Sequence, residues 1–256
     1  MIKILSIFFV LFLFFAEVTF AIPDANKEHS NELKTGFIHL SQVDPSIIIN
    51  LKYTQHDNIT GSQVDGFIDG KAIVTIETAN ALREVQEDLT MHGYSLVIYN
   101  AYMPTKAYNK FDSWLRDKDS DNKKDYYYPN VTKTALESQG YIKAKLEHTR
   151  GSTVDVTIIA IGQQLQKPAK AQKRSYKGYH DIIYLNDGTA DMATSYDTMD
   201  PLSSFSNKDI PQDSYANRKL LRDTMKNHGF IPNEKFWWQF TLIREPFVDS
   251  QFDFDV

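Results

Sequence analysis

The sequence predicts an α+β fold, and three observations support this class. Segments with the two-residue period of strands interleave with segments whose apolar residues recur at helical spacing. Their order lacks the regular strand–helix–strand rhythm of a parallel α/β protein. The 256 residues contain no internal repeat. Without a short targeting segment at the start, the chain suits one large domain or two small ones.

The first half of the chain predicts three strands and two helices. Strands are expected where β-branched and aromatic residues cluster, at 37–40, 47–53 and 95–99. Helices are expected at 78–92 and 106–115. In the first helix Leu82, Val85 and Leu89 repeat at helical spacing, and Gly93 supplies the stop.

The second half predicts three more strands and one helix. The strands are expected at 154–161, 237–243 and 252–256, and the helix at 214–228, where Gly229 ends it. Two charged stretches predict loops: the acidic 117–125, and a basic run with Lys167, Lys170, Lys173, Arg174 and Lys177. The acidic stretch resembles the start of a calcium loop. A solvated loop is favoured, because Asn122 and Tyr128 stand where a calcium loop needs Gly and Glu.

The N-terminus predicts secretion. Residues 1–21 have a basic Lys3, an apolar core over 4–15 and a cleavage site after Ala21, as in a signal peptide. An uncleaved membrane anchor is the rival interpretation, although the apolar run is short for a bilayer span. Residues 22–36 are a polar leader. The protein is therefore expected to be secreted or periplasmic, with no membrane attachment after signal cleavage.

Composition excludes several classes of function. The chain has no cysteine, which rules out disulfides and thiol chemistry. Its formal charge of -5 gives no signal for nucleic-acid binding.

His148 and Asp155 are candidate metal ligands seven positions apart. On one continuous strand they would point to opposite faces, and on one helix they would lie about 10 Å apart along the axis. Neither arrangement places both within about 2 Å of one zinc ion. A turn between them would, and Gly151 is the residue that permits one. From spacing alone, a hydrogen-bonded polar pair without a metal is the favoured interpretation.

Several blocks of the sequence occur in the order found in one enzyme family. They are L-K-Y at 51–53, D-N-I-T-G at 57–61, Y-N-A-Y-M-P at 99–104, E-H-T-R-G-S-T-V-D-V at 147–156, D-M-A-T-S-Y-D at 191–197, N-R-K-L-L at 217–221, F-W-W-Q-F-T at 236–241 and F-D-F at 252–254. Together they resemble the zinc D-alanyl-D-alanine dipeptidases of the vancomycin-resistance type. This family has the Hedgehog/DD-peptidase fold, which implies a single domain over 37–256 with a mostly antiparallel sheet and flanking helices.

The resemblance implies roles for particular residues. In the family, the residues at His148 and Asp155 bind zinc together with a histidine at the position of Gln239. A glutamate at the position of Phe236 is the general base, and an arginine at the position of Met103 stabilises the transition state. The substrate-binding residues expected within the matched blocks are Tyr102, Ser152 and Trp238.

Three of these positions carry side chains that cannot do the family's chemistry. An amide is a poor zinc ligand, a phenyl ring cannot accept a proton, and a thioether cannot stabilise an oxyanion. Whether another residue rescues the site is left open. The candidates are His180 and His228 as ligands, Glu234 as base, and Lys106 and Arg150 as cations.

Two functions follow from these substitutions. The first is a catalytically degenerate family member that binds a peptidoglycan-derived peptide or an unknown protein partner, with weak zinc binding at most and no other cofactor. The alternative is an active zinc metallopeptidase that hydrolyses D-Ala-D-Ala or a related dipeptide in cell-wall metabolism.

Overall fold

The computed structural model describes residues 33–256, apart from 69, 118 and 120, so the predicted signal peptide and most of the polar leader lie outside the described residues. Its centre is a sheet of five strands, in the order β2 (Ile48–Ile49), β4 (Tyr94–Asn100), β5 (Thr153–Ala160), β9 (Gln239–Leu242) and β8 (Phe230–Pro232). The pair of β2 and β4 is parallel and the other pairs are antiparallel. The prediction of a mostly antiparallel α+β fold is therefore confirmed.

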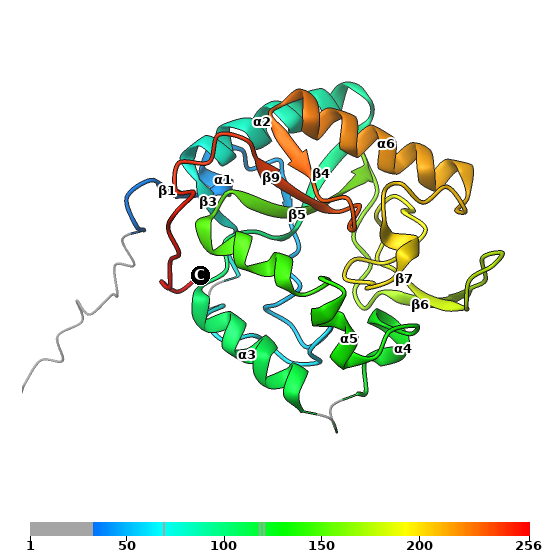
Figure 1. The fold of residues 1–256 in the computed structure, drawn as a ribbon. Helices are drawn as coiled ribbons and strands as arrows, with labels where there is room; N and C mark the ends of the chain where they lie inside the picture. The colour runs from blue at the N-terminus through cyan, green and yellow to red at the C-terminus, as the bar shows by residue number, and fades with distance from the viewer. Residues whose placement is uncertain (1–32, 69, 118, 120) are drawn as a thin grey trace, which may run out of the picture. The chain divides into compact units, whose positions relative to one another are not determined.

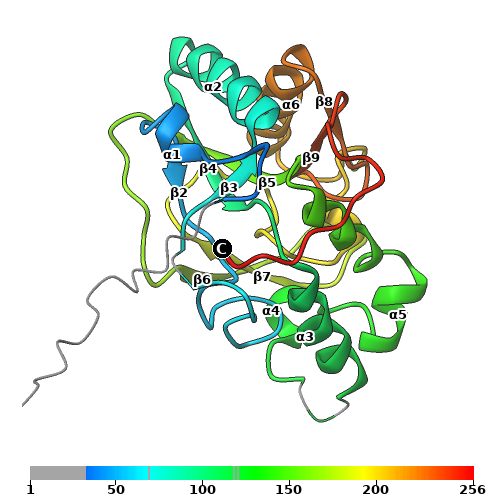
Figure 2. The same cartoon turned by 90° about the vertical axis from the view of Figure 1, so that its left-hand side faces the viewer.

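Helices lie on both sides of this sheet (Figures 1 and 2). The two long helices, α2 (Ile76–Met91) and α6 (Gln212–Asn227), run side by side over one face. They are bridged by His228, whose Nε2 lies 3.2 Å from a carboxylate oxygen of Asp88. The other side carries α3 (Thr105–Arg116) and the short helices α4 (Lys124–Tyr127) and α5 (Lys133–Ser138).

Two small sheets complete the fold. One pairs β1 (Phe37–His39) with β3 (Ile73–Thr75), and the other pairs β6 (Lys170–Arg174) with β7 (Ile182–Asn186). Short helices are α1 (Leu40–Val43) and the 3-10 helices η1 (Lys143–Arg150) and η2 (Pro201–Ser203). In the part of the chain that the structure describes, no helix is both long enough and apolar enough to cross a bilayer.

The long elements agree with the sequence pattern, and the differences concern short ones. Residues 252–256 form no strand, because their backbone bonds go to separate segments: Phe252 N donates to Thr149 O, and Val256 N donates to Gly66 O. The predicted strand over 47–53 shrinks to β2. The basic run was predicted as a loop, yet five of its residues form β6.

Gly151 makes the turn that the half-site requires. It ends η1 in the left-handed region, with a φ of 74°. A Cβ atom there would also lie 2.3 Å from the ring of Phe37, so a larger residue would have to displace that side chain. The chain therefore reverses after His148 and enters β5 toward Asp155.

Candidate active site

Asp155 lies in the middle of the central sheet, between two polar neighbours. Its partner on β4 is Asn100 and its partner on β9 is Gln239. Side chains of directly opposed residues in antiparallel strands lie on the same face. The turn at Gly151 brings His148 to that face as well, with its Nε2 3.3 Å from Oδ1 of Asp155. All four side chains are buried.

Three of these side chains form a nearly equilateral triangle. Nε2 of Gln239 lies 3.2 Å from Nε2 of His148 and 3.3 Å from Oδ1 of Asp155, and the latter two atoms are 3.3 Å apart. Ligand atoms at zinc distances of about 2.0–2.1 Å in a tetrahedron are separated by roughly 3.3–3.4 Å. The triangle therefore has the dimensions of one face of a zinc coordination tetrahedron.

The first corner of the triangle is a hydrogen-bond acceptor. Nδ1 of His148 lies 2.9 Å from the carbonyl oxygen of Ala101, which can only accept, so the proton of the neutral ring sits on Nδ1. The free lone pair on Nε2 then faces Gln239 and Asp155. This is the tautomer that zinc would require.

The third corner has the wrong polarity for a metal. The backbone N–H of Lys235 donates to Oδ1 of Asn233 (2.9 Å), so the amide nitrogen of Asn233 faces Gln239 and donates to its Oε1 (2.7 Å). The NH2 group of Gln239 must therefore point at His148 and Asp155. A protonated amide nitrogen has no lone pair to offer a cation.

The residues present thus do not fit a zinc ion, although two corners are ready for one. Among the described residues, no group of three or more histidine, aspartate and glutamate side chains could hold a metal ion. The amide of Gln239 instead bonds to both acceptors, so the half-site is satisfied as a hydrogen-bonded polar cluster.

Two further donors hold the other oxygen of Asp155. Oδ2 accepts from the hydroxyl of Tyr196 (2.8 Å) and from the side-chain amide of Asn100 (3.3 Å). Burial, together with the negative charge of Asp155, raises the pKa of Tyr196 well above its usual value, so the phenol stays a donor. These bonds compensate for burying a carboxylate in the middle of a sheet.

Replacing Tyr196 by phenylalanine should therefore destabilise the fold. Tyr196→Phe removes one bond to a buried charge, and we expect the free energy of unfolding to fall by about 1–3 kcal/mol. Urea denaturation would measure this change. Tyr126→Phe is the matched control, because that hydroxyl has no hydrogen-bond partner among the described residues, so the variant should unfold at the native midpoint. Equal midpoints for both variants would contradict the role given to Tyr196.

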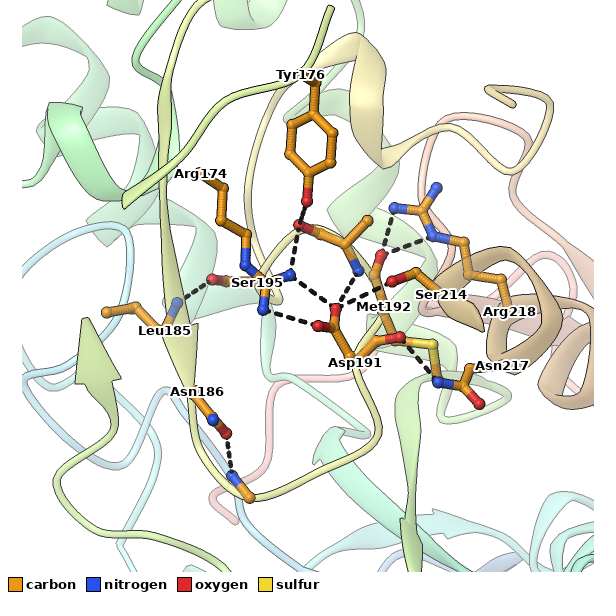
Figure 3. A network of polar contacts seen from close by, with 12 residues as sticks. Arg174, Tyr176, Leu185, Asn186, Asp191, Met192, Ser195, Ser214, Asn217 and Arg218 are labelled. Atoms are coloured by element: carbon orange, nitrogen blue, oxygen red, sulfur yellow. Dashed lines mark hydrogen bonds and ion pairs between the residues drawn. The ribbon is translucent and has the colours of Figure 1, made fainter. Parts of the chain in front are cut away.

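The segment that carries Tyr196 is fixed by two arginines (Figure 3). Arg174 of β6 binds Asp191 through two 2.7 Å contacts, and the buried Arg218 of α6 donates twice to the carbonyl of Met192, at 2.8 and 2.6 Å. Ala193 is held with a φ of 69°. The start of the turn is thus held at Asp191 and Met192. Further along, the backbone N–H of Leu185 donates to the hydroxyl of Ser195 at 2.6 Å, next to Tyr196.

The other two substituted positions also lie at this site. The sulfur of the buried Met103 accepts from the same Asn100 amide that contacts Asp155, at 3.1 Å. Phe236 stacks on Trp238 with a centroid distance of 4.9 Å, and Trp238 packs edge-on against Tyr196 at 5.4 Å. Met103 therefore contacts the cluster through Asn100, whereas Phe236 is connected to it only through Trp238 and Tyr196.

Of the three expected substrate-binding residues, only Trp238 lies beside this cluster. Tyr102 stacks on Phe254 at 4.2 Å and donates to its carbonyl, so its side chain is directed toward the C-terminal segment. The hydroxyl of Ser152 lies 3.1 Å from that of Thr75, at the start of α2. Both side chains therefore serve packing and helix capping.

None of the candidate rescue residues reaches the site, because each is engaged or placed elsewhere. His228 faces Glu84 and Asp88 on α2, and His180 is exposed at the hairpin of β6 and β7. The other three candidates form ion pairs: Glu234 with Arg222, Arg150 with Glu245, and Lys106 with Asp255.

Three residues of the cluster were not predicted: Asn100, Tyr196 and Asn233. The first two stand inside the matched sequence blocks 99–104 and 191–197, so the blocks were the available signal. Asn233 lies outside them and acts only through Gln239, which nothing in the local sequence indicates.

The sheet, the Gly151 turn and the buried triangle of His148, Asp155 and Gln239 define an α+β scaffold with a polar cluster at its centre. Comparison with known proteins gives the family. A model described as D-ala-D-ala dipeptidase matches residues 33–167 and 180–256. The chain belongs to this family of zinc metallopeptidases.

Curated relatives support the same assignment. The chain is similar to the D-alanyl-D-alanine dipeptidase of Enterococcus faecalis, at 32% identity over 88% of this chain and 100% of the relative. It is 30% identical to that of Enterococcus faecium, again over 88% and 100%. The Streptomyces coelicolor dipeptidase is 31% identical over 86% of this chain and 98% of its own length.

Residues 168–179 lie between the two ranges that the family model matches. They contain β6 and supply Arg174 and Tyr176, which bind Asp191 and the carbonyl of Ala193. A stretch outside the family match thus anchors the turn that leads to Tyr196.

Proposed function

We propose that this protein is a secreted, catalytically degenerate D-alanyl-D-alanine dipeptidase that binds a peptidoglycan-type peptide without hydrolysing it. The observation that carries the proposal is the donor at the third corner: Gln239 presents its NH2 group to His148 and Asp155. The predicted signal peptide over 1–21 would direct export to the compartment in which such peptides occur.

The loss of chemistry has three parts that reinforce one another. Without a metal there is no activated water and no Lewis acid. Phe236 can neither take the proton of an attacking water nor return it to the leaving group. Met103 offers no charge to a developing oxyanion. General acid–base catalysis and oxyanion stabilisation are each worth about a hundredfold or more, so hydrolysis should fall to background.

A small cavity beside the site supports the binding half of the proposal. It has a volume of about 30 Å³ and is lined by polar and aromatic side chains, among them Lys52, Asp57, Tyr99, Asp187 and Tyr196. Such a volume holds about two waters, so only one end group of a peptide would enter it. The cation in this lining is Lys52, whose ammonium already pairs with Asp187 at 3.0 Å, so a terminal carboxylate would share it with Asp187.

Binding without turnover is the test. Isothermal titration calorimetry with D-Ala-D-Ala, and with a peptidoglycan stem peptide ending in D-Ala-D-Ala, should show binding. In a separate hydrolysis assay with added zinc, the release of free D-alanine should stay at background. Lys52→Met should weaken binding, and Lys226→Met, an exposed lysine of α6, should not.

Two results would decide against the proposal. Release of D-alanine at enzymatic rates would support the active peptidase instead. If the folded protein gives no heat of binding with either peptide, a peptidoglycan peptide is excluded as the ligand and a protein partner remains.

A further inference from the structure

Asn233 stands behind Gln239 and holds its amide in one orientation. The contacts form a directed chain: Lys235 N–H to Asn233 Oδ1, Asn233 Nδ2–H to Gln239 Oε1, and Gln239 Nε2–H to His148 and Asp155. Each link fixes the direction of the next, because a backbone N–H can only donate. The backbone of Asn233 also donates to the carbonyl of Gln239, at 2.9 Å, which fixes the two residues to each other.

We infer that Asn233 is the positioning residue that keeps this site free of metal. The two ends of a glutamine amide have nearly the same size and shape. Turning the amide over would leave the triangle in place. Its third corner would then be the carbonyl oxygen of Gln239 in place of the donor nitrogen. An amide oxygen is a weaker zinc ligand than imidazole, but unlike the amide nitrogen it has lone pairs. His148 Nε2, Asp155 Oδ1 and Gln239 Oε1 would then face one point as three acceptors at the separations given above.

A single substitution should turn the amide over. In Asn233→Asp, one carboxylate oxygen can still accept from Lys235 N–H, and the other takes the place of the amide nitrogen. That second oxygen can only accept, so it repels Oε1 of Gln239 and attracts its NH2 group. The flipped amide leaves three acceptors facing one another, an arrangement that a divalent cation stabilises.

The native chain should show no stoichiometric zinc after dialysis against a chelator. Asn233→Asp should bind zinc about 10–100-fold more tightly than the native chain. This is the range typical of changes to residues that hydrogen-bond to metal ligands. Chelator competition and calorimetry would measure the affinity, and near-ultraviolet circular dichroism would check the fold. The double variant Asn233→Asp/Gln239→Leu is the control, because it keeps the new carboxylate but removes the amide.

The outcomes separate this inference from the proposed function on which it rests. Tight zinc binding by the native chain would overturn both. If a folded Asn233→Asp shows no gain in zinc affinity, only the inference is overturned. The same holds if the gain in zinc affinity survives in the double variant, since the introduced carboxylate would then bind the metal itself. Should Asn233→Asp not fold, Asn233→Ala frees the amide to turn. It should show a smaller gain, and no gain would count against the inference.

Discussion

Gln239→His should carry one zinc ion per molecule, whereas the native chain is expected to retain none after dialysis against a chelator. The variant replaces the donor at the third corner by an imidazole nitrogen, whose lone pair faces the same point as those of His148 and Asp155. The other two corners are already at ligand separation, with Nε2 and Oδ1 3.3 Å apart. Little reorganisation is therefore needed, and most of the coordination energy should appear as affinity.

The remaining contacts at the site favour this result. Asp155 keeps its bonds from Tyr196 and Asn100 at the oxygen that does not face the triangle. The Nδ1–H of His148 still donates to the carbonyl oxygen of Ala101, which holds the ring in the ligating tautomer. Metal bound to the folded chain should also raise the thermal midpoint, because ligand binding to the native state adds to stability.

Metal content after dialysis against a chelator, together with the thermal midpoint with and without zinc, would measure the effect. Gln239→Leu is the control: it removes the amide and adds no ligand, so it should stay free of metal. Adding His148→Ala to Gln239→His should abolish the gain. A folded Gln239→His that remains without zinc would show that the triangle is too rigid or too crowded to admit an ion.

Much of the fold could be predicted from the sequence because long elements carry periodic signals. Helix α2 was expected from Leu82, Val85 and Leu89, and all three are buried in the structure. β4 and β5 were expected from their apolar and β-branched runs. The strands of β3, β6 and β8 are three to five residues long, which is too short for a period to emerge.

The site was predictable in part for a similar reason. The ligand positions and the Gly151 turn lie within contiguous blocks, where spacing and residue type constrain geometry. The orientation of the Gln239 amide could not be predicted in this way. It depends on Asn233, six positions earlier in the chain, and on the backbone N–H of Lys235 that orients Asn233. The resemblance also pointed to Tyr102 and Ser152, whose side chains contact Phe254 and Thr75.

Restoring chemistry needs more than the metal. The variant that combines Met103→Arg, Phe236→Glu and Gln239→His should bind zinc and cleave D-Ala-D-Ala, whereas each single change should leave hydrolysis at background. The reason is that ligand, base and cation act as a unit, so the loss of any one conceals the others. Relative to Gln239→His alone, we expect a gain of about a hundredfold or more from the base and similarly from the cation.

This gain should come with a loss of stability, because both added groups enter packed surroundings. Phe236 stacks on Trp238 and tilts against Tyr141, so a glutamate there gives up aromatic contacts and buries a carboxylate. An arginine at Met103 displaces a sulfur that now accepts from Asn100. Bound zinc offsets part of this cost, so unfolding and metal content should be measured before turnover. Phe236→Gln in the same background is the matched control, since it has nearly the shape of glutamate but cannot act as a base.

The outcome bears on how this protein diverged. Cleavage by the triple variant, with none by its Phe236→Gln counterpart, would show that the dipeptide cleft survives and that only the reacting groups were replaced. A well-folded triple variant that binds zinc and cleaves no D-amino-acid dipeptide would place the change in the cleft itself. The stretch 168–179 would then be the first region to alter, because through Arg174 and Tyr176 it anchors the turn that positions Tyr196 at Asp155.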